Sequence, residues 1–157
     1  MRKSHITWIP LGASLPDEAW MNLDHLASVG VSSEDGEYPI ESALLQEGKR
    51  GWRAANPGAQ TIRLVFDESQ KLKRILLVFE DTVNVRTQEF VLRWASDIKG
   101  PFREIVRQQW NFSQPDSIRE TEDFGVELSE VKVLELMIIP DKSGGRVCAS
   151  LASLRVA

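Results

Sequence analysis

Hydrophobic and polar side chains alternate in short runs along most of this chain. The runs 61–66, 75–79, 89–94 and 106–110 place apolar residues at every second position. A period of two indicates a β-strand with one buried face, and the run 75–79 is apolar on both faces. Further short strands are predicted near 124–128, near 132–139 and over 146–156.

Turn-forming residues separate these runs. The segments 67–70, 96–101 and 141–145 are rich in Asp, Ser, Gly, Lys and Pro, and a polar stretch covers 113–123. Short strands with regularly spaced turn signals predict an all-β fold, an antiparallel β-sandwich. No strand–helix–strand unit is visible, which argues against a nucleotide-binding α/β fold.

The first 28 residues have a different period. Ser14 and Asp17 resemble a helix-capping box, and apolar residues follow at helical spacing. We therefore expect a short amphipathic helix over 15–27, within an N-terminal extension (1–28) that packs on a sandwich domain (29–157).

Composition restricts the class of protein. The chain has 157 residues, 42% of them hydrophobic and 27% charged, as in a single globular domain. A formal net charge of -4 argues against a broad basic surface for nucleic acid or for an anionic membrane. No segment reaches the roughly 18 apolar residues of a membrane span.

The single cysteine, Cys148, cannot form an internal disulfide, which favours a reducing compartment and a cytoplasmic location. Cys148 lies in the apolar run 147–149, so we interpret it as a small core residue and not as a nucleophile.

Several segments together resemble the discoidin, or coagulation factor 5/8 type C, domain family. The resemblance covers roughly 29–156 and is carried by VSSED (31–35), IESAL (40–44), GWRA (51–54), QTIRLVFD (60–67), LKRILLVF (72–79), FVLRWA (90–95), LELMI (134–138) and ASLASLRV (149–156).

The resemblance implies the galactose-binding-like jelly roll, an eight-stranded sandwich. Members of this family bind carbohydrates, phospholipids or proteins, and a related domain is a DNA-repair scaffold. The overall likeness is to small bacterial carbohydrate-binding proteins, which is an analogy of fold. Trp52 stands at the family's core tryptophan position.

One departure from the family concerns calcium. Many members hold a structural calcium ion with an Asp before the conserved Trp and a Glu in the last strand. Here the first region is 45–48 (LQEG), and the last strand offers Ser150 and Ser153. Calcium prefers several carboxylate oxygens. We therefore expect no metal or other cofactor, although Glu47 and backbone carbonyls leave a structural calcium open.

The sequence holds no catalytic motif. The two histidines, His5 and His25, both lie in the N-terminal extension. Acidic residues crowd the segment 116–123, where a pair of carboxylates is a glycosidase alternative, but a solvated acidic loop is the simpler interpretation. We expect a protein that is not an enzyme.

Strand order places the candidate ligand site at one end of the sandwich. A hairpin centred near Ile98 sets 86–88 opposite 110–111, and a hairpin near Ser69 returns Glu80 to the level of Gln60. The loops 47–59, 80–88 and 110–116 should then gather at one end, joined by 34–40. Loops held on a rigid sandwich commonly carry binding residues.

These loops contain the side chains that sugar recognition needs. Guanidinium and amide groups give directional hydrogen bonds to hydroxyls, and an aromatic ring covers the apolar face of a sugar. The candidate ligand-binding residues are Tyr38, Arg50, Arg53, Asn56, Arg86, Gln88, Trp110 and Asn111. Trp52 and Trp94 are interpreted as packing residues, and Trp110 is open between core and stacking platform.

Two functions from different classes follow. The preferred hypothesis is a non-catalytic module that binds a carbohydrate or another small polyol. The alternative is an intracellular protein–protein interaction adaptor, favoured by the expected location. Nucleic-acid binding through Arg50, Arg53, Arg63 and Arg86 is the weakest hypothesis, and it predicts affinity that falls steeply with salt.

Overall fold

The computed structural model describes residues 20–45 and 50–157. The elements in chain order are α1 (Leu23–Leu26), β1 (Ala27–Val31), α2 (Glu41–Leu44), β2 (Trp52–Pro57), β3 (Gln60–Glu80), β4 (Arg86–Ala95), β5 (Arg103–Phe112), β6 (Arg119–Ile139), β7 (Cys148–Leu151) and β8 (Ser153–Val156).

The strands form an antiparallel sandwich, as the alternation predicts. One layer has the order β1-β3-β6-β4-β5. The other layer is built by β8 with the second half of β3 and the first half of β6. A small sheet of β2 and β7 completes the fold.

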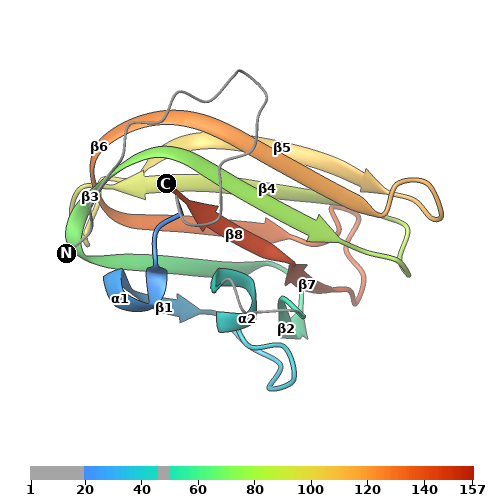
Figure 1. The fold of residues 1–157 in the computed structure, drawn as a ribbon. Coiled ribbons are helices and arrows are strands. Elements are labelled where there is room, and N and C mark those ends of the chain that lie inside the picture. Colours follow the sequence, from blue (N-terminus) through green and yellow to red (C-terminus); the bar gives the residue numbers. More distant parts are fainter. Residues whose placement is uncertain (1–19, 46–49) are drawn as a thin grey trace.

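Two strands, β3 and β6, belong to both layers because each bends sharply at the same end of the molecule (Figure 1). The buried positions of β3 explain the bend. In the first half of β3 a buried set of side chains occupies even-numbered positions, and in the second half a buried set occupies odd-numbered positions. These two sets are Ile62, Leu64 and Phe66, then Ile75, Leu77 and Phe79. The register with β6 shifts between Val65 and Arg74, as at a β-bulge.

The predicted hairpin at 67–70 is therefore wrong. β3 runs unbroken from Gln60 to Glu80, and its two halves pair with different parts of β6. The consequence drawn from that hairpin still holds, because the bend returns both ends of β3 to the far end of the sandwich (Figure 1). The predicted hairpin around 96–101 is confirmed: Gln88 pairs with Trp110.

Other boundaries differ from the prediction. The polar stretch 113–123 is not all loop, because β6 begins at Arg119. The predicted strand 146–156 is divided at Ala152, where the chain passes from pairing with β2 to pairing with β3. In the range predicted as a helix (15–27), 15–19 lie outside the described residues, Leu23–Leu26 is helical, and Ala27 begins β1.

The core lies between the layers and includes the inward residues of β3, β4, β6 and β8. Trp52 is 1% exposed and its Nε1 donates to the Ser33 carbonyl at 3.2 Å, which confirms its packing role. Cys148 is half-buried and packs against the core, so it is less enclosed than expected. None of the described helices is long and apolar enough to cross a membrane.

Candidate functional site

The connections 81–85, 113–118 and 140–147 meet at the end of the sandwich opposite the bend of β3 (Figure 1). Backbone hydrogen bonds join them. The Asp81 N–H donates to the Ile118 carbonyl at 2.8 Å, and the Lys142 N–H donates to the Thr87 carbonyl at 2.8 Å. We call this region the loop end. The predicted meeting of 80–88 with 110–116 is confirmed, whereas 140–147 was not foreseen.

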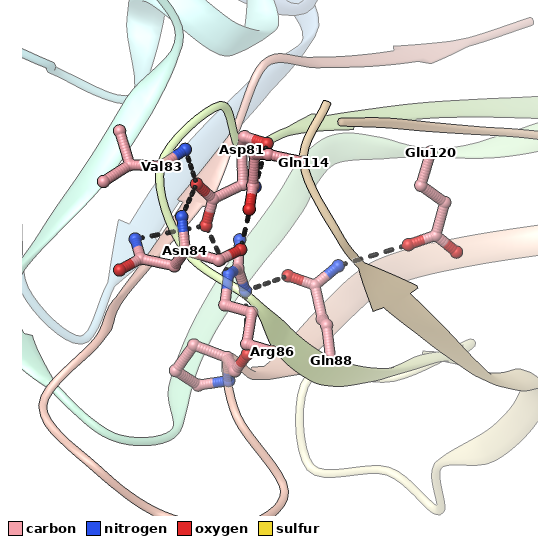
Figure 2. A network of polar contacts seen from close by, with 8 residues as sticks. Asp81, Val83, Asn84, Arg86, Gln88, Gln114 and Glu120 are labelled. Carbon is pink, nitrogen blue, oxygen red and sulfur yellow. Dashed lines mark hydrogen bonds and ion pairs between the residues drawn. The ribbon is translucent and has the colours of Figure 1, made fainter. Parts of the chain in front are cut away.

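Arg86, the first residue of β4, holds the loop end together (Figure 2). Its side chain is 1% exposed, and Nε donates to Asp81 at 2.6 Å. Nη1 donates to the Pro140 carbonyl at 2.7 Å and to Gln88 Oε1 at 3.1 Å. The guanidinium also covers the Phe112 ring at 4.5 Å. Arg86 thus ties these connections together, and its side chain is almost entirely enclosed by protein.

Asp81 organises the connection that follows β3. Its Oδ1 accepts the N–H groups of Val83 and Asn84, each at 2.8 Å. Burial raises the pKa of the Asp81 carboxyl, but the hydrogen bonds from Asn84, Arg86 and Val83 outweigh burial and lower it overall. From 113–118, Gln114 Nε2 donates to the carbonyls of Asp81 and Asn84, at 2.9 Å each (Figure 2).

This bonding turns two valines outward. Val83 is 79% exposed and Val85 is 75% exposed, although both are apolar. Each presents an apolar side chain to solvent on a connection whose backbone is fixed by polar contacts. An exposed apolar surface on an ordered loop is a candidate contact for a ligand or partner.

The polar network continues inward from Arg86. Gln88 is 0% exposed, and its Nε2 donates to Glu120 Oε1 of β6 at 3.3 Å (Figure 2). Glu120 is also 0% exposed, so the interpretation of 116–123 as a solvated acidic loop is wrong at this residue. Burial, with the neighbouring Glu122 carboxyl, raises the pKa of Glu120 to about 8.

An open hollow of about 390 Å³ lies on the loop end beside Arg86. We call it the loop-end hollow. It is lined by residues from β4, from the end of β5, and from the connections on either side: Val85, Arg86, Thr87, Asn111, Phe112, Ser113, Asp141 and Ser143. Hydroxyl, amide and carboxylate groups therefore converge beside one exposed apolar side chain.

The polar groups of the hollow are oriented by one another. Thr87 Oγ1 donates to Asn111 Oδ1 at 2.7 Å across the β4–β5 pair. The Ser143 hydroxyl and N–H both donate to Asp141 Oδ1, at 2.8 Å and 3.1 Å. These bonds from Ser143 lower the pKa of Asp141, so its carboxyl is ionised at neutral pH.

The eight predicted ligand residues separate into two groups. Tyr38, Arg50 and Arg53 lie together: Arg53 covers the Tyr38 ring at 4.2 Å, and Arg50 approaches it at 6.0 Å. Asn56 is exposed on the same strand as Arg53. Because the face of Tyr38 is already covered by a guanidinium, that face is not open to stack on a sugar.

The second group is Arg86, Gln88, Trp110 and Asn111, on β4 and β5. Arg86 and Asn111 line the loop-end hollow, and of these two only Asn111 is exposed. Trp110 is half-buried with Nε1 enclosed, so its indole lies mainly between the layers, beside Gln88. Arg86 and Gln88 are buried and hydrogen-bonded to protein, and Arg86 also lines the hollow, so ligand contact at these two residues stays a prediction.

Sequence reasoning missed Thr87, Asp141 and Ser143. Thr87 faces away from the core because it alternates with Arg86 and Gln88, and that period was readable. Asp141 and Ser143 follow β6 in a segment interpreted only as a turn. They lie at the loop end because β6 is a single bent strand, which ends at Ile139 just before this segment.

The other hypotheses change as well. Of the four arginines proposed for nucleic acid, Arg86 is paired with Asp81 and Arg63 is paired with Glu135 at 2.6 Å. Among residues 20–45 and 50–157, no three His, Cys, Asp or Glu side chains are placed to hold a metal ion. Residues 46–48 of the calcium region lie outside the described residues, as does His5.

A second open hollow, of about 640 Å³, lies at the bend of β3 between 67–69 and 96–99. Its walls are charged and turn residues, and Ile98 is 56% exposed there. The loop-end hollow, in contrast, adjoins the buried polar network of Arg86, Gln88 and Glu120. The loop-end hollow is therefore the better candidate site.

No family model and no curated protein matches the chain. Solved structures do resemble it. A family 32 carbohydrate-binding module from Clostridium perfringens NanJ, in complex with galactose, aligns with a TM-score of 0.63 at 15% identity. That alignment covers 87% of this chain and 96% of the other.

Two further structures are similar. CpGH89CBM32-5 from Clostridium perfringens, in complex with GalNAc-β-1,3-galactose, has a TM-score of 0.66 at 15% identity over 87% of this chain and 98% of its own. A pectin-binding carbohydrate-binding module has a TM-score of 0.62 at 16% identity, covering 84% and 90%. At these identities the likeness concerns the fold, and it confirms the predicted galactose-binding-like sandwich.

Proposed function

We propose that this chain is a non-catalytic carbohydrate-binding module whose ligand binds at the loop-end hollow. One observation carries the proposal: Thr87, Asn111, Asp141 and Ser143 converge on one hollow from separate parts of the chain. Together these side chains offer hydrogen-bond donors and acceptors, which suits the hydroxyls of a sugar. Val85 adds an apolar surface for a C–H face.

The hollow is preorganised. Its connections are tied by buried bonds of Arg86 to Asp81 and to the Pro140 carbonyl. A site that is ordered before binding loses less conformational entropy on binding. The three similar modules named above, bound to galactose, bound to GalNAc-β-1,3-galactose or described as pectin-binding, support sugars as the ligand class.

The test is a glycan array followed by titration calorimetry with the best hit, starting from galactose, N-acetylgalactosamine and galacturonate oligomers. Asn111→Ala should weaken binding about tenfold, because roughly 1.4 kcal/mol of hydrogen bonding is lost. Lys99→Ala, at the bend of β3, is the matched control and should bind like wild type. Calcium-loaded and chelator-treated protein are compared in parallel, since the calcium question stays open.

The proposal would be overturned if no sugar on the array binds saturably, or if Asn111→Ala leaves the affinity for the best hit unchanged.

The second candidate is a protein-binding adaptor, and the exposure of Val83 and Val85 is the observation that favours it. In that case a partner captured from a lysate should be lost by Val83→Ser, while sugars have no effect on the capture.

A further inference from the structure

A continuous chain of side-chain hydrogen bonds leads from Glu120, buried near the start of β6, to the connections of the loop end (Figure 2). Glu120 on β6 accepts from Gln88 on β4, Gln88 accepts from Arg86, and Arg86 donates to Asp81 and Pro140. Glu120 and Gln88 are 0% exposed, and Arg86 is 4% exposed. Nothing in the proposed sugar contacts accounts for this buried row.

The orientation of Gln88 depends on Glu120. An amide offers an acceptor at one side and a donor at the other. Because Nε2 donates to Glu120, Oε1 faces Arg86 and accepts from its guanidinium. With no acceptor at Glu120, the amide is free to turn its N–H₂ group toward the cationic Arg86, which would break this link.

The surroundings of Glu120 disfavour a negative charge. Its Oε2 is buried and accepts no hydrogen bond from the described residues. Glu122 lies two residues further along the same strand, and its carboxyl disfavours a second negative charge beside it, which raises the pKa of Glu120. On the neighbouring strand β3, Phe79 pairs with Glu120, and its side chain is apolar.

On the opposite layer, the hydrogen bond from Gln88 and the charge of Arg86 favour the ionised form of Glu120, but burial and Glu122 outweigh them, so the pKa is raised overall. On β4 the positive charge of Arg86 is already balanced by Asp81. On β5, Trp110 lies opposite Gln88, and Gln108 donates to Glu122 at 3.4 Å, so neither brings a charge. A buried carboxyl in such surroundings stays neutral.

We propose that Glu120 is a positioning residue for the loop-end hollow: its neutral form fixes Gln88, and through Gln88 and Arg86 it holds the connections 81–85 and 140–147 in place. The inference rests on the proposed function only in calling the hollow a ligand site. Its structural content concerns the connections themselves and can be measured without any sugar.

Ionisation should release this arrangement. A charged Glu120 repels Glu122 and attracts Arg86, which then competes against Asp81 and Pro140 for the same guanidinium. Either Glu120 turns toward water and leaves Gln88, or Arg86 shifts inward and leaves the connections. Burial and Glu122 raise the pKa of Glu120 to about 8, so the change falls in an accessible range of pH.

The test follows the wild-type chain by carbon-detected NMR from pH 5 to 9.5, a method that does not depend on slowly exchanging amide protons. The side-chain carboxyl carbon of Glu120 should titrate near pH 8, and the backbone nitrogens of Val83, Asn84 and Lys142 should titrate with the same midpoint. In Glu120→Gln these three nitrogens should not titrate in that range. Glu127→Gln, an exposed neighbour on the same strand, should behave like wild type.

The inference would be overturned if the Glu120 carboxyl titrates below pH 6, or if the backbone nitrogens of the connections do not titrate with it. Both outcomes are read from the wild-type titration alone, so the test does not depend on a variant that folds. Where a sugar binds, its affinity should fall about tenfold between pH 7 and 9 in wild type, since about one Glu120 in ten is then protonated, and stay level in Glu120→Gln. Binding that is independent of pH in wild type would reject the inference and leave the proposed function standing.

Discussion

Glu120→Gln should stabilise the fold, and the gain should grow with pH. Gln has the shape of a protonated Glu, keeps an acceptor for Gln88, and offers an N–H₂ donor to Glu122. It carries no charge at any pH. The wild-type residue is fully buried, and its pKa rises from an ordinary 4.5 to about 8 on folding.

The sign and size follow from proton linkage. Below pH 4.5 both the folded and the unfolded chain carry the proton, so Glu120 contributes its full stability there. Between 4.5 and 8 the folded state binds more protons, so the free energy of unfolding falls by about 1.4 kcal/mol per pH unit. From pH 5 to 7.5 the wild type should lose roughly 3 kcal/mol that the variant keeps, or on the order of 8 °C in Tm.

Urea unfolding of both proteins at pH 5, 6, 7 and 7.5 gives the difference directly. Carboxyls with lowered pKa values, such as Asp81 and Asp141, act with the opposite sign and at lower pH, and they cancel in the comparison. A difference in unfolding free energy that is constant across this range would refute the reasoning, because it would show that Glu120 is ionised in the folded wild type.

Three other perturbations test the account. Arg86→Met should cost about 3–5 kcal/mol in urea unfolding because Asp81 is left buried without its counter-charge, and adding Asp81→Asn should restore part of that loss. Asp141→Asn should raise the affinity for galacturonate relative to galactose in calorimetry, since the ionised carboxylate repels an anionic sugar; an unchanged ratio would contradict this. Val83→Ser with Val85→Ser should change stability by no more than about 0.5 kcal/mol, because both side chains are exposed, and a larger loss would mean that they pack.

The sandwich could be predicted from the sequence because one face of nearly every strand is apolar. The alternation at Ile62, Leu64 and Phe66 and again at Ile75, Leu77 and Phe79 fixes which side chains lie inside. The same pattern contains the bend, since the parity changes between the two sets. A turn and a bulge both shift the buried side chains from even-numbered to odd-numbered positions. The sequence pattern therefore did not distinguish them, and the predicted turn is a bulge within β3.

The candidate site was harder to predict because its polar residues follow no period that separates ligand contacts from buried support. Arg86 and Asn111 are both polar residues next to a loop, yet Arg86 is enclosed by Asp81 and Pro140 while Asn111 faces solvent. Burial of a charge depends on partners far away in the chain. Pro140 is 54 residues from Arg86, and Glu120 is 32 residues from Gln88.

Chemical-shift mapping of the labelled chain with galactose, or with the best array hit, tests the central claim most directly. The account predicts saturable shifts confined to 85–87, 111–113 and 141–143, with the bend at 67–70 and 96–99 unchanged. Shifts centred on the bend, or none at millimolar sugar from any class on the array, would contradict a sugar site at the loop end.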